Sequence, residues 1–476
     1  MDVWFDTAEM LIGGRWVRAA DTLPVEDPSY GRAVGRIAAG APGDVGAAVE
    51  AAQDALRGPW GRTPAVERGR ALTRLGRLVA ERVDDLAALE AMDVGKPLSQ
   101  ARADAVALAR YCEFYGGAAD KVTGETIPFL DGYTVYTLRQ PHGVTGHIVP
   151  WNYPMQIIGR SVGAALAMGN ACVLKPAEEA SLTALAFARL AAAAGLPDGA
   201  LNVVPGTGGD AGAALAAHPG VAHLSFTGSV ATGAEVQAAA ARNVVPVTLE
   251  LGGKSPQVVF DDADLDAALP FLVRAGIQNA GQTCSAASRI LVQRGVYDAV
   301  AGRMAAAYRA LRVGPAMEDR DLGPLISARQ KGIVEGFVSR GGGEVLAQGV
   351  VETDEPGHYV PPRLIAGVDP AAELAQAEVF GPVQVISPFA DEAEAVAMAN
   401  GTPYGLVAGV WTRDGGRQMR MARDLRAGQV FLNDYGAGGG VELPFGGVGR
   451  SGHGREKGFE ALRGFSALKT VAAKHG

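Results

Sequence analysis

The chain has 476 residues, of which 48% are hydrophobic and 20% charged, and its net charge is −8. This composition is typical of a well-packed soluble protein, and the length indicates about two or three domains. The negative charge excludes the basic surface of a nucleic-acid-binding protein, and no run approaches the ~18 apolar residues of a membrane span.

The three cysteines are far apart and form no CxxC pair: Cys112, Cys172 and Cys284. This usage predicts neither a disulfide framework nor a zinc ribbon, and it favours a reducing compartment. The seven histidines are scattered without metal-ligand spacing, so we expect no metal site. The first residues, MDVWFDTAEMLIGGRW, lack the basic and apolar regions of a signal peptide. We therefore expect a cytoplasmic protein.

Residues 124–143, GETIPFLDGYTVYTLRQPHG, break the helical pattern and predict a β-hairpin arm. Residues 464–476, GFSALKTVAAKHG, predict a terminal strand. Exposed strand edges of this kind invite pairing with another subunit. We therefore expect a homo-oligomer, either a homodimer or a homotetramer.

Short apolar runs alternate with helical periodicity from residue 143 onward. Strands are predicted over 143–149, 171–176, 200–206, 221–228 and 246–253, and helices over 154–168, 179–194, 210–217 and 230–241. Further strands are predicted over 288–293, 379–389, 405–412 and 428–433. Alternation of this kind predicts right-handed crossovers onto parallel sheets, and hence an α/β fold with two units.

Two sequence patterns match known functional motifs but lack the context that those motifs require. Gly206, Gly208 and Ala211 fit G-x-G-x-x-A after a strand, but residues 211–234 hold no acid for the ribose of a dinucleotide. GRSVG at 159–163 fits a nucleophile elbow, yet Ser161 lies inside a predicted helix instead of a strand-to-helix turn. A serine hydrolase using Ser161 stays as an alternative, as does a non-catalytic binding or structural protein.

Seven motifs in fixed order carry a stronger signal: PWNYP from 150, LKPAE from 174, FTGS from 226, LELGGK from 249, GQTC from 281, EVFGPV from 378 and PFGGVGRSGHGREKG from 444. Through them the chain resembles the aldehyde dehydrogenase superfamily over nearly its whole length. The resemblance implies NAD(P)-dependent oxidation of an aldehyde to a carboxylic acid. It also implies a Rossmann-like cofactor domain (1–120 and 143–250), an α/β catalytic domain (251–440) and an oligomerisation arm (121–142 and 455–476).

By this resemblance Cys284 is the nucleophile, Glu250 the general base that hydrolyses a thioester, and Asn152 an oxyanion donor together with the Cys284 N–H. A thiol near its usual pKa is already partly ionised and strongly nucleophilic. Glu250 favours hydrolytic release, since CoA-acylating relatives typically lack this base. The chain departs from many relatives at Gly449-Arg450, where they carry lysine, and it has no second cysteine beside Cys284.

The resemblance also assigns the cofactor site. Lys175 and Glu178 are expected at the adenosine ribose, where the Glu178 carboxylate would repel the 2′-phosphate of NADP and so favour NAD. The helix start at Gly228, Ser229 and Gly233 is expected at the pyrophosphate. The remaining expected contacts are Glu378 and Phe380 at the nicotinamide end, with Pro150, Trp151 and Gly208 as lining.

Tyr153 and Arg160 are the expected substrate residues. Succinic semialdehyde dehydrogenases place an arginine at the position matching Arg160, where a guanidinium can bind the remote carboxylate of the substrate in a fork. The same arginine could instead pair with an acid of a neighbouring element. The sequence therefore leaves open whether the substrate is an ω-carboxylated aldehyde.

Overall fold

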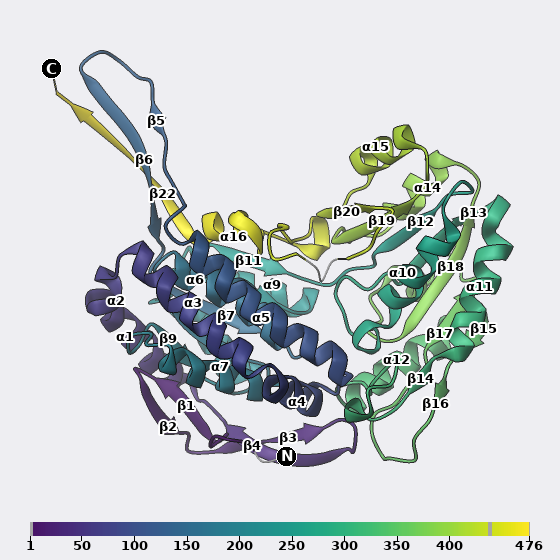
Figure 1. Ribbon diagram of the computed structural model, residues 1–476, viewed down its shortest axis with the longest axis horizontal. Helices are drawn as coiled ribbons and strands as arrows, with labels where there is room; N and C mark the ends of the chain where they lie inside the picture. Colours follow the sequence, from purple (N-terminus) through teal and green to yellow (C-terminus); the bar gives the residue numbers. More distant parts are fainter. Residues whose placement is uncertain (1–2, 437–439, 476) are drawn as a thin grey trace.

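Residues 3–436 and 440–475 are described by a computed structural model (Figure 1). Two twisted β-sheets, each flanked by helices, lie in neighbouring halves of the molecule, and a narrow arm of strands projects away from both (Figure 1). The expected α/β fold is thus confirmed.

The first sheet has eight strands with a parallel centre. Its order is β2 (Arg15–Arg18), β1 (Glu9–Ile12), β9 (Leu201–Val203), β8 (Ala171–Pro176), β7 (Val144–Val149), β10 (His223–Thr227), β11 (Val247–Glu250) and β21 (Gly452–His453). β7, β8, β10 and β11 are almost wholly buried, as parallel strands covered on both faces must be. The predicted strands of residues 143–253 are therefore correct in kind and order.

Helices cover both faces of this sheet. They are α1 (Pro42–Arg57), α2 (Pro59–Arg62), α3 (Ala65–Glu81), α4 (Val83–Val94), α5 (Leu98–Ala118), α6 (Pro154–Ala167), α7 (Leu182–Ala193), α8 (Ala213–Ala217), α9 (Val230–Ala241) and α16 (Gly458–Gly464). α7 begins three residues later than expected, because the predicted start falls on a turn before Ser181. A π-helical turn, Gly208–Gly212, precedes α8.

The second sheet has seven strands in the order β15 (Glu344–Gln348), β17 (Arg363–Ala366), β18 (Val383–Phe389), β13 (Arg289–Gln293), β12 (Pro256–Val259), β19 (Val407–Trp411) and β20 (Gln429–Leu432). All its pairs are parallel except β15 with β17. Its helices are α10 (Leu265–Ile277), α11 (Tyr297–Ala310), α12 (Ala328–Arg340), α13 (Glu373–Gln376), α14 (Glu392–Ala399) and α15 (Gly415–Asp424). β18 begins later than expected because Phe380 is left-handed, with φ 54°. Two small ladders complete the fold: β3 (Thr22–Asp27) with β4 (Arg32–Ala38), and β14 (Arg312–Val313) with β16 (Val350–Val351).

The arm consists of β5 (Thr126–Ile127), β6 (Tyr133–Pro141) and the terminal β22 (Ser466–Lys474). β22 pairs antiparallel with β6 along the full length of both strands. The arm extends away from the sheets (Figure 1) and exposes several large apolar side chains: Ile127, Phe129, Leu130, Tyr136, Leu138 and Leu468. The predicted hairpin and terminal strand thus form one sheet.

Ser161 lies in the middle of α6 and is buried. Its hydroxyl donates a hydrogen bond of 2.8 Å to the Ile157 carbonyl, one helical turn earlier. This is an ordinary helix contact, and no strand-to-helix turn exposes the oxygen. The structure therefore gives the serine-hydrolase alternative no nucleophile elbow.

Candidate active site

The first sheet changes direction beside β7. From β7 the chain winds to β8 and β9 on one side, while β10 and β11 lie on the other. Ligands of open α/β sheets bind at the carboxyl ends of the strands where the winding reverses. Here these ends lead into Pro150, Trp151 and Asn152 after β7, and into Gly228 and Ser229 after β10. All five line a cavity of about 460 Å³.

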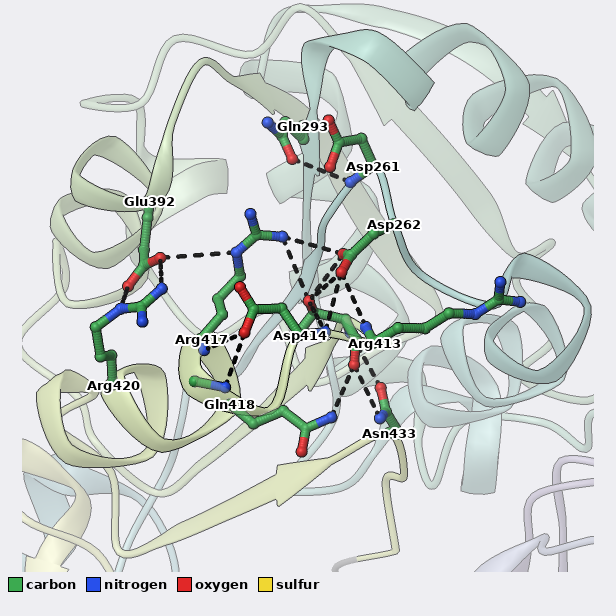
Figure 2. A network of polar contacts seen from close by, with 12 residues as sticks. Asp261, Asp262, Gln293, Glu392, Arg413, Asp414, Arg417, Gln418, Arg420 and Asn433 are labelled. Atoms are coloured by element: carbon green, nitrogen blue, oxygen red, sulfur yellow. Dashed lines mark hydrogen bonds and ion pairs between the residues drawn. The ribbon is translucent and has the colours of Figure 1, made fainter.

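The corresponding point of the second sheet, between β12 and β19, is closed by the protein itself (Figure 2). The Asp262 carboxylate follows β12 and accepts hydrogen bonds from the backbone N–H groups of Arg413 and Asp414, at 3.1 and 3.0 Å. The Thr412 hydroxyl and the Arg417 guanidinium also bind it. The start of α15 is capped in turn by the Asp414 carboxylate, which accepts the N–H groups of Gly416 and Arg417 at 2.8 and 3.1 Å. The open crevice belongs to the first sheet.

One end of the 460 Å³ cavity carries a lysine–glutamate pair. Lys175 Nζ lies 3.0 Å from Glu178 Oε2, and the Gly208 N–H donates to Glu178 Oε1 at 3.4 Å. Burial raises the pKa of Glu178, but Lys175 and the backbone N–H groups outweigh it and hold the pKa below the usual range. Lys175 and an ionised Glu178 are suited to the hydroxyls of a ribose.

The helix start beyond β10 has the features of a phosphate site. Ser229 caps α9 by accepting the Thr232 N–H at 3.2 Å, and Gly228 and Ser229 both line the cavity. Gly233 does not line it. A side chain at Gly233 would meet Leu251 at 2.6 Å, so this glycine lets α9 pack closely against the loop after β11.

The opposite wall comes from the second sheet. The Trp151 and Phe380 rings meet edge to face, with centroids 5.3 Å apart. Glu378 Oε1 accepts the Gly253 N–H at 3.0 Å, and burial raises the Glu378 pKa to about 7. Gly252 makes room for this carboxylate, because a Cβ there would lie 2.1 Å from Glu378 Oε2.

Cys284 follows three consecutive residues in the left-handed conformation: Asn279, Ala280 and Gly281, with φ of 49°, 53° and 73°. Left-handed backbone is unfavourable for alanine, so the surroundings must hold it. The Asn279 amide donates to the Asn152 carbonyl at 3.0 Å, and Gln282 donates back to the Asn279 carbonyl at 3.0 Å. The small and amide residues before the cysteine thus build the turn that presents it.

Asn152 and Cys284 lie where two cavities meet. Both line the 460 Å³ cavity and a second cavity of about 40 Å³ on its far side. The Asn152 amide donates to the Gln282 carbonyl at 3.0 Å, which leaves the second N–H of this amide for a ligand. A reacting group at Cys284 would therefore have one cavity on each side and an amide donor beside it.

The ionisation expected for Cys284 is wrong for this structure. Burial raises the pKa of the thiol to about 12, although Arg160 lowers it. The sulfur faces a cavity, but its surroundings stabilise a thiolate less than water does. The thiol therefore ionises less readily here than a cysteine in water does.

Glu250 ends β11 and is buried, with no hydrogen-bond partner at either carboxylate oxygen among the described residues. Burial raises the pKa of Glu250 well above its usual range, and Arg160 is the largest opposing influence. Glu250 also lines the 460 Å³ cavity. A carboxylate with a raised pKa and no protein partner is suited to take a proton from water.

Arg160 lines the 40 Å³ cavity, but its guanidinium is already paired. It forms an ion pair with buried Glu456, donates to the Thr227 hydroxyl at 3.2 Å, and stacks on Phe445 at 5.0 Å. The Ser225 hydroxyl binds the other Glu456 oxygen at 2.6 Å. Of the two roles considered for Arg160, the structure favours pairing with a neighbouring acid.

Replacing Arg160 with methionine should raise the Glu250 pKa further, because a nearby positive charge is lost. We therefore expect the acid side of the kcat–pH profile to move to higher pH. Arg160→Lys keeps the charge and should restore the profile, which a purely structural defect would not allow. The activity of Arg160→Met should fall equally with neutral and with ω-carboxylated aldehydes of equal length. A loss confined to the ω-carboxylated aldehydes would make Arg160 a carboxylate ligand.

Tyr153 is held by a buried ammonium that the sequence did not reveal. Lys96 forms ion pairs with Glu90, at 2.6 Å, and with Asp104, and its Nζ lies 3.9 Å from the centre of the Tyr153 ring. The Tyr153 hydroxyl bonds Thr283 Oγ1 at 2.9 Å. A charge cluster remote in sequence thus fixes the wall beside Cys284.

Other residues at the site were not predicted. Glu456, Phe445 and Lys457 belong to the C-terminal motif, whereas Gln156 and Gln278 lie close to the PWNYP and GQTC motifs. The motifs therefore mark these regions of the chain, but not which of their side chains face the cavity. Among residues 3–436 and 440–475, no cluster suited to a metal ion occurs. In the same ranges no helix combines the length and apolar character needed to cross a membrane.

Comparisons with known proteins agree with this geometry. The model of the "Aldehyde dehydrogenase family" matches residues 16–471. A hydroxyisobutyraldehyde dehydrogenase of Mycolicibacterium austroafricanum is 40% identical over 469 residues, 97% of this chain and 93% of the relative. A crystal structure of a candidate aldehyde dehydrogenase from Burkholderia cenocepacia has TM-score 0.98 and 64% identity, covering 98% of this chain and 100% of that one. The NAD⁺ complex of an aldehyde dehydrogenase from Bacillus cereus has TM-score 0.97 and 36% identity, with 99% and 97% covered.

Proposed function

The chain belongs to the aldehyde dehydrogenase family, and from this premise we propose the residues by which it oxidises an aldehyde to a carboxylic acid with NAD. The observation that carries the assignment is the position of Cys284 and Asn152 between two cavities, with Glu250 on the wall of the larger one. The first test is NADH absorbance with a panel of aldehydes. A protein that binds NAD but oxidises no aldehyde would contradict the proposal.

The larger cavity fits NAD through its ribose-binding pair, its helix start at Ser229 and its aromatic end at Phe380. NAD bound there supplies the hydride acceptor. The Cys284 thiol gives its proton to solvent water in the cavity and its sulfur adds to the aldehyde carbon, so the C=O π electrons move to the carbonyl oxygen and make it an oxyanion. Asn152 and the Cys284 N–H donate hydrogen bonds to this oxygen. Its collapse expels hydride and leaves a thioester on Cys284.

Glu250 completes the reaction. Its carboxylate takes a proton from water, the resulting hydroxide attacks the thioester carbon, and the C–S bond breaks to release the carboxylic acid. The electron pair of that bond returns to sulfur as thiolate. Because Glu250 must be ionised to act and its pKa is raised, deacylation should slow as the pH falls through this raised value.

Glu178 should make the enzyme prefer NAD to NADP. At ~4 Å and an effective dielectric constant of ~20, its carboxylate would repel one unit of phosphate charge by at most about 4 kcal/mol, so we expect a preference of about tenfold or more. Glu178→Gln should reduce the ratio of kcat/KM with NAD to kcat/KM with NADP, mainly by raising kcat/KM with NADP. Equal efficiency of the wild-type enzyme with both cofactors would contradict this role.

We propose a cofactor unit (1–120 and 143–250), a catalytic unit (251–440) and an oligomerisation arm (121–142 and 455–476). Residues of both the cofactor and the catalytic unit line the larger cavity, which supports this division. The apolar surface of the arm supports assembly into a homodimer or homotetramer through β5, β6 and β22. The cysteine usage supports a cytoplasmic location.

A further inference from the structure

The 40 Å³ cavity beside Cys284 adjoins a much larger cavity of about 1050 Å³, which we call the outer cavity. The two cavities share two lining residues, Gln156 and Gln278. Gln156 lies in the first two turns of α6, and Gln278 directly follows α10, so the two side chains come from opposite structural units. A substrate that enters from the outer cavity must pass this pair of amides, which we call the glutamine neck.

Gln156 is held in a fixed orientation. Its amide nitrogen donates to Asp104 Oδ1 at 2.5 Å, and Asp104 in turn pairs with buried Lys96. Because the nitrogen is engaged, the carbonyl oxygen Oε1 is left as an acceptor. An aldehyde with a hydroxyl group could donate to it.

Gln278 offers hydrogen-bond donors as well as an acceptor. Within residues 3–436 and 440–475 its side-chain amide makes no hydrogen bond, and the residue is only partly exposed. Its two donors and its acceptor can therefore serve a ligand. Apolar aldehydes would cover both glutamines without replacing the hydrogen bonds that these amides make with water, which is unfavourable.

The rest of the inner wall is mixed. Tyr153 and Thr283 present hydroxyl groups, and Arg160 and Lys457 carry cations against the ring of Phe445. Ile157 and the Phe445 ring add apolar surface, against which a short carbon chain can pack. The cavity is small as well, which restricts the group next to the aldehyde.

We propose that the glutamine neck makes this enzyme select short aldehydes that carry a hydroxyl group near the reacting carbon over hydrocarbon aldehydes of equal length. The inference rests on the proposed function and specifies its substrate class. Gln156 and Gln278 are then specificity-determining residues that contact the substrate hydroxyl, while Cys284, Asn152 and Glu250 carry the chemistry.

The test compares propanal with 2-hydroxypropanal and 3-hydroxypropanal, using kcat/KM from NADH formation. We expect the wild-type enzyme to prefer at least one hydroxylated aldehyde by about tenfold or more. Gln278→Leu and Gln156→Leu should each lower that ratio about tenfold, because kcat/KM should fall for the hydroxylated aldehyde and rise for propanal.

Ile157→Val is the matched control, since it changes the volume of the same cavity without changing its polarity. It should alter propanal and the hydroxyaldehydes alike. Faster wild-type oxidation of propanal, or an unchanged ratio in both leucine variants, would overturn the glutamine neck while leaving the aldehyde dehydrogenase activity intact. Absence of activity with every aldehyde would instead contradict the proposed function. The wild-type comparison needs no variant and decides the matter even if a variant folds poorly.

Discussion

Cys284→Ser should abolish NADH formation, with kcat falling by about four orders of magnitude, as when other covalent catalysts lose their nucleophile. A serine hydroxyl ionises far less readily than a thiol and is the weaker nucleophile. The substitution changes one atom, so the left-handed turn from Asn279 to Gly281 and the Asn152 contacts should persist. NAD binding, measured by quenching of protein fluorescence, should therefore change little.

The pH dependence of the first turnover gives a second readout for Cys284. Burial raises the thiol pKa to about 12, so the reactive thiolate fraction increases with pH across the neutral range. The rate of the first NADH burst should rise accordingly in the wild-type enzyme. Ser161→Ala is the matched control, because it removes a hydroxyl from α6 and should leave the activity in place. Activity that survives Cys284→Ser but not Ser161→Ala would reinstate a serine nucleophile.

The motifs predicted more of the site than the periodicity did. Cys284, Asn152 and Glu250 could be located because each stands in a short stretch whose residue types the chemistry requires. The sheet order could be anticipated only as parallel winding, and the position of the crevice required the fold. The motif does not say that Gly233 also has a packing role: a side chain at this position would meet Leu251, so its absence lets α9 pack closely.

Long-range charge contacts could not be predicted. Lys96 reaches the Tyr153 ring, and Arg160 reaches Glu456 across 296 positions, because α5, α6 and the C-terminal segment meet in space. No local sequence pattern predicts a contact between residues so far apart in the chain. For the same reason the raised pKa of the Cys284 thiol could not be predicted. This pKa depends on the residues that the folded chain places around the sulfur, and a motif does not show how deeply a residue is buried.

Glu250→Gln should separate the two halves of the reaction. We expect a burst of about one NADH per subunit followed by a stall, with steady-state kcat lowered by about 10²- to 10⁴-fold, the range of general-base catalysis. Glutamine has nearly the same shape but cannot take a proton from water, so the thioester on Cys284 should accumulate. Mass spectrometry of the stalled protein should find the acyl group on the peptide containing Cys284.

If NAD binds normally but no burst occurs, Glu250 must also remove the thiol proton. The raised pKa of Cys284 gives this outcome a physical reason, because such a thiol needs a base to ionise. Hydroxylamine distinguishes the cases, because it attacks a thioester without a protein base and should restore turnover only if acylation still occurs. Glu178→Gln is the matched carboxylate control: it lies in the same cavity, but at the ribose-binding pair. It should change the cofactor KM and produce no stall, which ties the stall to the carboxylate at the end of β11.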